Sequence, residues 1–158
     1  MPAAGSARIL AFGILAIQLP VPLLAQAEKF VRFETGVVSI ERPAVQGSLF
    51  GLRLGGPLAP SGVVRWELGS VYSRAGNGFW TGEGGVEVRA SGRQAAAFFG
   101  VGTGIESDFW TTGLLERATA GLDMRIGWST ALRLAAQVGR HQGRPGPNAV
   151  TLGLEFRM

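Results

Sequence analysis

The sequence contains no cysteine, one histidine and, in Lys29, one lysine. The absence of cysteine excludes a disulfide framework and a cysteine-based metal site. A single histidine with scattered carboxylates gives no cluster of metal ligands. The glycine-rich stretch at 100–104 is followed by a predicted strand end and loop, whereas a phosphate-binding loop needs a helix there. We therefore predict no metal and no cofactor. The net charge of +4 is small and scattered, which argues against nucleic acid as a partner.

Long hydrophobic runs are also lacking. The apolar run at residues 9–17, directly after Arg8, is too short for a membrane-spanning helix, which takes about 20 apolar residues. Ala25-Gln26-Ala27 then forms a small-x-small cleavage pattern. These features predict a secretory signal peptide over 1–27 and one mature domain over 28–158. In the mature part, glycine or charge interrupts every apolar run, so this part can cross a membrane only as strands.

Instead of helical runs, the sequence has 25 glycines and an alternation of apolar with polar or small residues from end to end. This period of two predicts an all-β domain, an eight-stranded antiparallel up-and-down barrel. The predicted strands lie near 30–40, 48–55, 63–73, 79–90, 95–106, 116–126, 130–141 and 148–158. Tight connections are expected at 91–92 and 128–129, at the end that holds both termini. Longer loops are expected at 107–115 and 142–148, at the other end, as is typical of outer-membrane barrels.

Alternation alone leaves two architectures open. A soluble, lipocalin-like binding barrel has apolar residues inside, here Phe33, Trp66, Leu122 and Leu134, whereas a membrane barrel turns them toward lipid. Glycines share the polar face, and glycine weakens a solvated strand but makes room inside a narrow lumen. Arginines and acids on this face are nearly balanced, as expected of paired ions in an interior. We predict a transmembrane barrel with a charge-filled, plugged lumen that contains Arg32, Glu34, Arg53, Arg65, Glu67, Glu83, Glu87, Arg89, Arg117, Asp123, Arg125, Arg133, Glu155 and Arg157.

The signal segment, the eight alternating strands and the final TLGLEFRM resemble the small outer-membrane β-barrel family of Gram-negative bacteria, the OmpA/OmpX-type barrels. The resemblance implies location in the outer membrane, contact with outer-membrane lipid, and a C-terminal signal for the outer-membrane assembly machinery. Thr151, Gly153, Phe156 and Met158 match the positions of that signal. Met158 stands where the family usually has phenylalanine.

His141 is the obvious candidate for a catalytic base, since several outer-membrane barrels are enzymes. In the lipid A deacylase family, a serine nucleophile follows such a histidine by two residues, but Gly143 occupies that position here. We therefore predict a non-enzymatic, monomeric protein whose role is structural or depends on binding by its loops. Candidate loop contacts are Phe109, Trp110 and Arg144. A lipocalin-like binder, a lipid A-modifying enzyme and a small pore are the alternatives.

Overall fold

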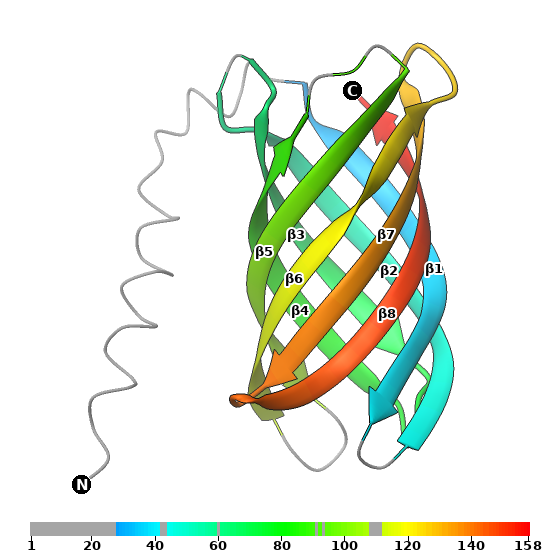
Figure 1. Cartoon of the computed structure of the whole chain (residues 1–158), viewed down its shortest axis with the longest axis vertical. Coiled ribbons are helices and arrows are strands. Elements are labelled where there is room, and N and C mark those ends of the chain that lie inside the picture. Colours follow the sequence, from blue (N-terminus) through cyan, green and yellow to red (C-terminus); the bar gives the residue numbers. More distant parts are fainter. Residues whose placement is uncertain (1–27, 42–43, 60, 91, 93, 108–111) are drawn as a thin grey trace, which may run out of the picture.

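The structure is a closed barrel of eight antiparallel strands, each hydrogen-bonded to the next and the last to the first (Figure 1). This computed structural model describes residues 28–41, 44–59, 61–90, 92, 94–107 and 112–158. The strands are β1 (Phe30–Glu41), β2 (Ala44–Pro57), β3 (Val64–Ser73), β4 (Phe79–Arg89), β5 (Ala95–Ser107), β6 (Thr112–Arg125), β7 (Thr130–His141) and β8 (Arg144–Arg157). The predicted all-β, eight-stranded up-and-down barrel is confirmed. The predicted signal peptide over 1–27 lies outside the described residues.

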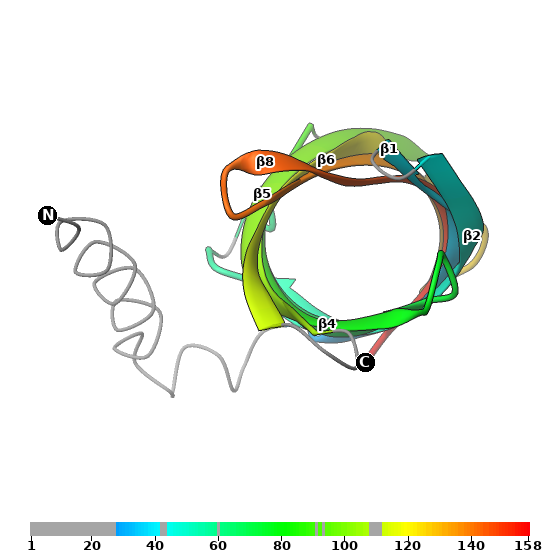
Figure 2. The ribbon, with the colours of Figure 1, turned by 90° about the horizontal axis from the view of Figure 1, so that it is seen from below.

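The pairing of β1 with β8 closes the barrel into a ring (Figure 2). Their ladder runs from the Phe30–Arg157 pair to the Ser39–Asn148 pair. Beyond it, the backbone N–H of Met158 donates a hydrogen bond to the carbonyl of Lys29 at 2.8 Å. The sheet therefore has no free edge along the body of the barrel. Within the described ranges, no helix is long and apolar enough to cross a membrane.

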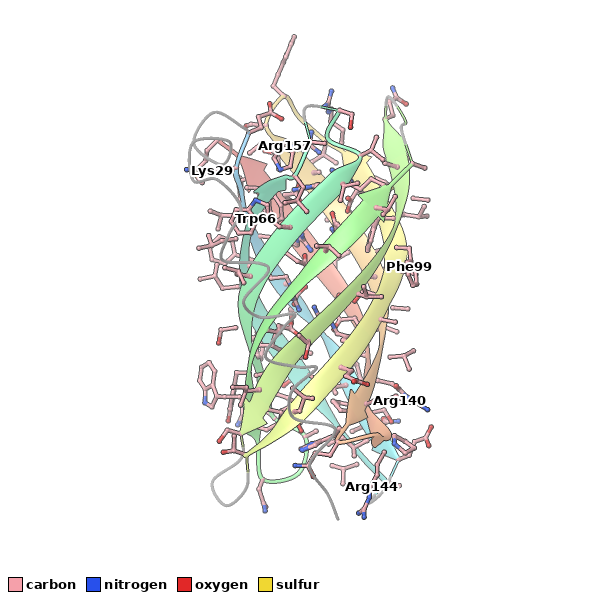
Figure 3. All side chains as sticks on the ribbon, turned by 90° about the vertical axis from the view of Figure 1, so that its left-hand side faces the viewer. Lys29, Trp66, Phe99, Arg140, Arg144 and Arg157 are labelled. Carbon is pink, nitrogen blue, oxygen red and sulfur yellow. The ribbon has the colours of Figure 1, made fainter. Side chains whose placement is uncertain are left out.

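Alternation assigns the two faces of every strand, because successive side chains point to opposite sides. Large apolar side chains are exposed on the outside of each strand, among them Phe33, Leu54, Leu68, Val88, Phe99, Leu122, Leu134 and Leu152. Phe99 is 56% exposed and points away from the barrel wall (Figure 3). Charged side chains such as Arg32 and Glu155, at 1% and 0% exposure, fill the inside. The distribution is the reverse of that in a soluble globular domain.

The lengths of the connections differ from the prediction. At the end that holds the termini, the connections are 58–63, 90–94 and 126–129; at the far end they are 42–43, 74–78, 108–111 and 142–143. The predicted longer far-end loops are wrong, because β6 begins at Thr112 and β8 begins at Arg144. Residues 112–115 and 144–148, which have the composition of loops, belong to strands.

The β7–β8 hairpin shows why strand structure reaches this far. Gln142 and Gly143 have φ angles of 51° and 78°, and two central residues with positive φ form the tight turn that suits a hairpin. Pro145 and Pro147 lie within β8 although proline cannot donate to a ladder. They are tolerated because β8 pairs with β1 only from Asn148 onward. At both prolines the side of β8 that would face β1 is therefore unpaired, and a missing backbone donor on that side breaks no ladder.

An apolar cluster fills the far-end half of the lumen, a feature that the sequence analysis did not predict. It consists of Val38, Leu49, Val71, Ala75, Phe79 and Ala149, with Ile40 and Val45 packed against it. Val38 is 1% exposed, and Leu49 and Val71 are each 4% exposed. The lumen is therefore filled by apolar side chains toward the far end and by charged side chains toward the end that holds the termini.

Candidate functional site in the barrel lumen

The structure brings the predicted lumen charges together. Every residue of the predicted set except Arg125 takes part in at least one ion pair among the described residues. The pairs fall into two groups along the barrel axis. The middle group consists of Glu34, Arg53, Glu67, Glu83 and Arg117. The terminal-end group consists of Arg32, Arg65, Glu87, Arg89, Asp123, Arg133, Glu155 and Arg157.

Arg53 is the centre of the middle group. Its Nε donates to Glu34 at 2.7 Å, and its two terminal nitrogens contact Glu67, at 3.5 Å, and Glu83. Arg117 contacts the same Glu83 and lies 3.4 Å from Glu67. Arg53 is 1% exposed, so these charges lie outside bulk water. A planar guanidinium with five donors suits this task because it can serve several carboxylates at once.

In the terminal-end group, carboxylates are shared between arginines from distant strands. Glu155 lies 3.1 Å from Arg65 and 3.5 Å from Arg32. Glu87 lies 2.5 Å from Arg133 and 3.6 Å from Arg65. Arg32 also reaches a carboxylate of the middle group at 3.1 Å, so it links the two groups.

Lumen glycines make room for these side chains. A Cβ added to Gly51 would lie 2.7 Å from Cγ of Glu34, and one added to Gly69 would lie 2.7 Å from Cγ of Arg53. Gly51 is the register partner of Glu34, and Gly69 is the register partner of Arg53. Each charged side chain thus crosses the neighbouring strand at a position that has no side chain of its own.

Two phenylalanines complete the ionic half of the lumen, and neither was predicted from the sequence to lie there. The guanidinium carbon of Arg65 lies 3.8 Å from the ring centroid of Phe30, and that of Arg133 lies 3.4 Å from the centroid of Phe98. A cation over an aromatic face gains electrostatic attraction where water is scarce. The signal for Phe98 was present, because it shares its face with the glycines at 100, 102 and 104.

Arg125 is a correction to the predicted lumen set. It is the last residue of β6, it is exposed, and it forms no ion pair with another described residue. Its register partner on β7 is Ala131. The face that points inward along β6 opens at this position into the mouth of the barrel, because the strand ends there.

The side chains that a lipocalin-like barrel would place inside lie outside. Phe33, Leu122 and Leu134 are 56%, 49% and 47% exposed, and Trp66 shares the outward face of β3 with Leu68. This placement contradicts the soluble alternative, which requires these four side chains to line the lumen. Among the described residues, no three histidine or acidic side chains form a group that could hold a metal ion.

Comparison with known proteins gives a likeness of structure. No protein-family model matches the sequence, and no curated protein matches it. Neisserial surface protein A (NspA) superposes with a TM-score of 0.68 at 6% identity, over 83% of this chain and 97% of that chain. The N-terminal β-barrel domain of Pseudomonas aeruginosa OprF matches with a TM-score of 0.63 at 13% identity, over 84% of this chain and 100% of that domain. The chain has the fold of the small outer-membrane β-barrels.

The outer membrane enzyme PagL shares this small-barrel fold, with a TM-score of 0.52 at 14% identity over 82% of this chain and 99% of that chain. The candidate base predicted from the sequence is His141. Its Nδ1 lies 3.0 Å from Oε1 of Glu106 at the far mouth of the small barrel, and its ring lies over Gly113, where an added Cβ would be 1.8 Å from Nε2. Gly113 on β6 thus lets a side chain from β7 reach one from β5. A histidine held by a carboxylate is half of a nucleophile-activating arrangement. Residue 143, two positions after His141, is a glycine and has no side chain that could act as the nucleophile.

The predicted assembly signal lies on the closing strand β8, except for Met158, which directly follows it. Thr151 is 2% exposed and faces the lumen, where its Oγ1 accepts a hydrogen bond from Nε2 of Gln137 at 3.5 Å. A Cβ on Gly153 would lie 3.2 Å from Cδ of Arg32, so this glycine also clears space for a lumen arginine. Phe156 and Met158 are 40% and 70% exposed. The four positions therefore divide into a lumen-facing pair, Thr151 and Gly153, and an exposed pair, Phe156 and Met158.

The predicted loop contacts are placed only in part. Phe109 and Trp110 lie outside the described residues. Arg144 is exposed, but it is the first residue of β8 and follows a two-residue turn, so it does not lie in a long loop. Figure 3 shows Arg144 and Arg140 at the end of the barrel opposite to Lys29 and Arg157.

Proposed function

We propose that the chain is an integral outer-membrane barrel protein without enzymatic activity, whose role is structural. The observation that carries this proposal is the inverted distribution of side chains, with large apolar residues outside and paired ions inside. Strand length supports it: the strands contain 10 to 14 residues, and a tilted strand needs about 9 to 11 to cross a bilayer. Outer-membrane lipid would then cover the apolar exterior.

The orientation and assembly of the barrel follow from the same proposal. Both ends of the barrel domain lie at one end of the barrel, which we assign to the periplasm, with residues 1–27 as the cleaved export signal. Thr151, Gly153, Phe156 and Met158 would be read by the outer-membrane assembly machinery. A closed sheet offers no edge strand for pairing with a second copy, which supports a monomer.

The filled lumen supports a structural role over conduction. The middle group and the far-end apolar cluster lie in series along the axis, and the space between them is a cavity of about 30 Å³ lined by both fillings. Purified protein in planar bilayers should give no stable channel steps. Regular steps in single-channel recordings would replace this proposal with the pore alternative.

Binding at the far end is the second candidate function, and the β1–β2 hairpin is the observation that favours it. Ile40 and Val45 pair with each other beyond the last rung that β1 shares with β8 and that β2 shares with β3. The hairpin therefore extends past these ladders, while both side chains pack against the apolar cluster. Its short connection limits the area that it offers. For this reason we place the structural role first.

Fractionation tests the membrane assignment. We expect the protein in the outer-membrane fraction, extracted by detergent, with gel migration that changes on heating because the barrel resists unfolding by the detergent. Recovery as a soluble periplasmic protein would refute the proposal. For enzymatic activity, the purified protein is incubated with lipid A. Release of an acyl chain that is lost in His141→Ala would establish the lipid A-modifying alternative instead.

A further inference from the structure

The mouth at the end that holds the termini contains a vestibule of about 150 Å³. The charged residues of its lining are Arg89, Arg125, Arg157 and Asp123, and the rest of the lining comes from small or polar residues of the connections and strand ends. A buried water needs about 10 to 15 Å³ of such space, so the vestibule has room for several waters or for one small ion with its hydration. The cavity beside the far-end apolar cluster is smaller, at about 30 Å³, and most of its lining is apolar.

The vestibule carries an excess of positive charge that the lumen network does not cancel. In the terminal-end group, five arginines face three carboxylates, and one of them, Arg32, also pairs with Glu67 of the middle group. Arg125 at the mouth adds a further guanidinium. The middle group has the opposite imbalance, two arginines to three glutamates. Among the charged residues that line the vestibule, three arginines therefore face one carboxylate.

The three lining arginines also have donor groups to spare. Arg89 contacts Asp123 at 2.5 Å through one terminal nitrogen, while its buried Nε has no hydrogen-bond partner among the described residues. Arg157 uses its Nε toward Glu155 at 3.4 Å. Arg125 forms no ion pair within the described chain and is exposed to solvent. Asp123 is already shared with Arg133 at 3.7 Å, so it satisfies Arg89 only in part.

We propose that this vestibule binds a small tetrahedral oxyanion, of the phosphate or sulfate class. Guanidinium groups bind such anions through paired, charge-assisted hydrogen bonds, and a site with three of them and one carboxylate favours an anion over a cation. Arg125 would make the outer contact and Arg89 the inner one. The inference concerns the mouth of the barrel and does not depend on the membrane in which the barrel sits.

The test is calorimetric titration of inorganic phosphate into the full barrel in a maltoside detergent, with ionic strength held constant by sodium chloride. We expect saturable binding at one site, made roughly fivefold to tenfold weaker by Arg125→Gln, as loss of one charge-assisted contact at a partly open site implies. Arg144→Gln, an exposed arginine at the opposite end, is the matched control and should leave the affinity unchanged. Titration with sulfate should give the same pattern.

Three results would overturn the proposal. The first is a titration without saturable heat of phosphate binding, and the second is an equal loss of phosphate affinity in Arg125→Gln and Arg144→Gln. The third is displacement of bound phosphate by chloride at the same ionic strength. Arg125→Gln is expected to fold normally, because Arg125 forms no ion pair with another described residue. An independent readout is the side-chain Nε signal of each arginine in nuclear magnetic resonance spectra. Phosphate should shift the signals of Arg89, Arg125 and Arg157 and leave that of Arg144 in place; shifts that appear equally at Arg144 would mean general charge screening.

Discussion

Replacing Arg53 with methionine tests whether the lumen network stabilises the barrel. Methionine follows the path of the arginine stem over Gly69, so the change removes charge with little change in packing. It leaves Glu67 and Glu83 with other arginines, but Arg53 is the one described ion-pair partner of Glu34. Removing one partner of a buried ion pair costs about 3 to 5 kcal/mol, and we expect Arg53→Met to lower the free energy of unfolding by this amount.

The double variant Arg53→Met with Glu34→Gln separates charge from packing. It removes the orphaned carboxylate, so it should be about 1 to 2 kcal/mol more stable than Arg53→Met alone, within the usual coupling energy of residues in one network. The assay is urea unfolding in lipid vesicles, followed by tryptophan fluorescence and gel migration. Arg144→Met, at an exposed strand end, is the control and should change stability by less than about 0.5 kcal/mol. A double variant less stable than the single one would refute the reasoning.

Three further predictions address the exterior, the far mouth and assembly. Leu134→Arg, midway along β7, should cost about 2 to 4 kcal/mol for unfolding from lipid vesicles, and a cost near zero would argue against lipid contact. Gly113→Ala should separate His141 from Glu106, and the ring signals of His141 in nuclear magnetic resonance spectra should change. The free energy of unfolding should fall by less than about 1 kcal/mol. Unchanged ring signals would contradict the described geometry. Phe156→Ala should reduce recovery in the outer membrane while the purified chain still refolds in detergent; equal recovery would remove Phe156 from the assembly signal.

The face of each strand was predictable from the sequence because side-chain direction depends only on the period of two. Arg65 and Glu87, which are register partners on β3 and β4, illustrate this, since each was assigned to the lumen from its own strand. The network itself was not predictable. Which arginine meets which carboxylate depends on register and on the path of each side chain across the barrel, as in the link from Arg32 to Glu67.

The far-end apolar cluster shows a limit of alternation. Val38 follows Val37, and Leu49 precedes Phe50, so one residue of each pair must point inward whichever register is chosen. The sequence thus contains the signal that apolar side chains enter the lumen. It does not show that they gather at one end, because this follows from the register of β1 with β2, which places Val38 opposite Gly47 and near Leu49.

The far-end connections were misjudged for a related reason. Glycine and proline at 143–147 are typical of a loop, and local preference favours that reading. In the barrel, β8 has one neighbour along this stretch, so missing donors at Pro145 and Pro147 cost little. Whether proline is compatible with a strand depends on pairing with a distant part of the chain, which sequence preference does not contain.

Closure of β1 on β8 determines when the barrel can become stable. The first strand to be made pairs with the last, so the ladder that joins them forms only after all the strands between them exist. Contacts this distant in sequence make folding slow. Until they form, β1 presents unpaired backbone groups and apolar side chains to any similar chain nearby, which is the condition for aggregation. The completed barrel needs no partner along its edges, but the unfolded chain needs protection until β8 has paired with β1.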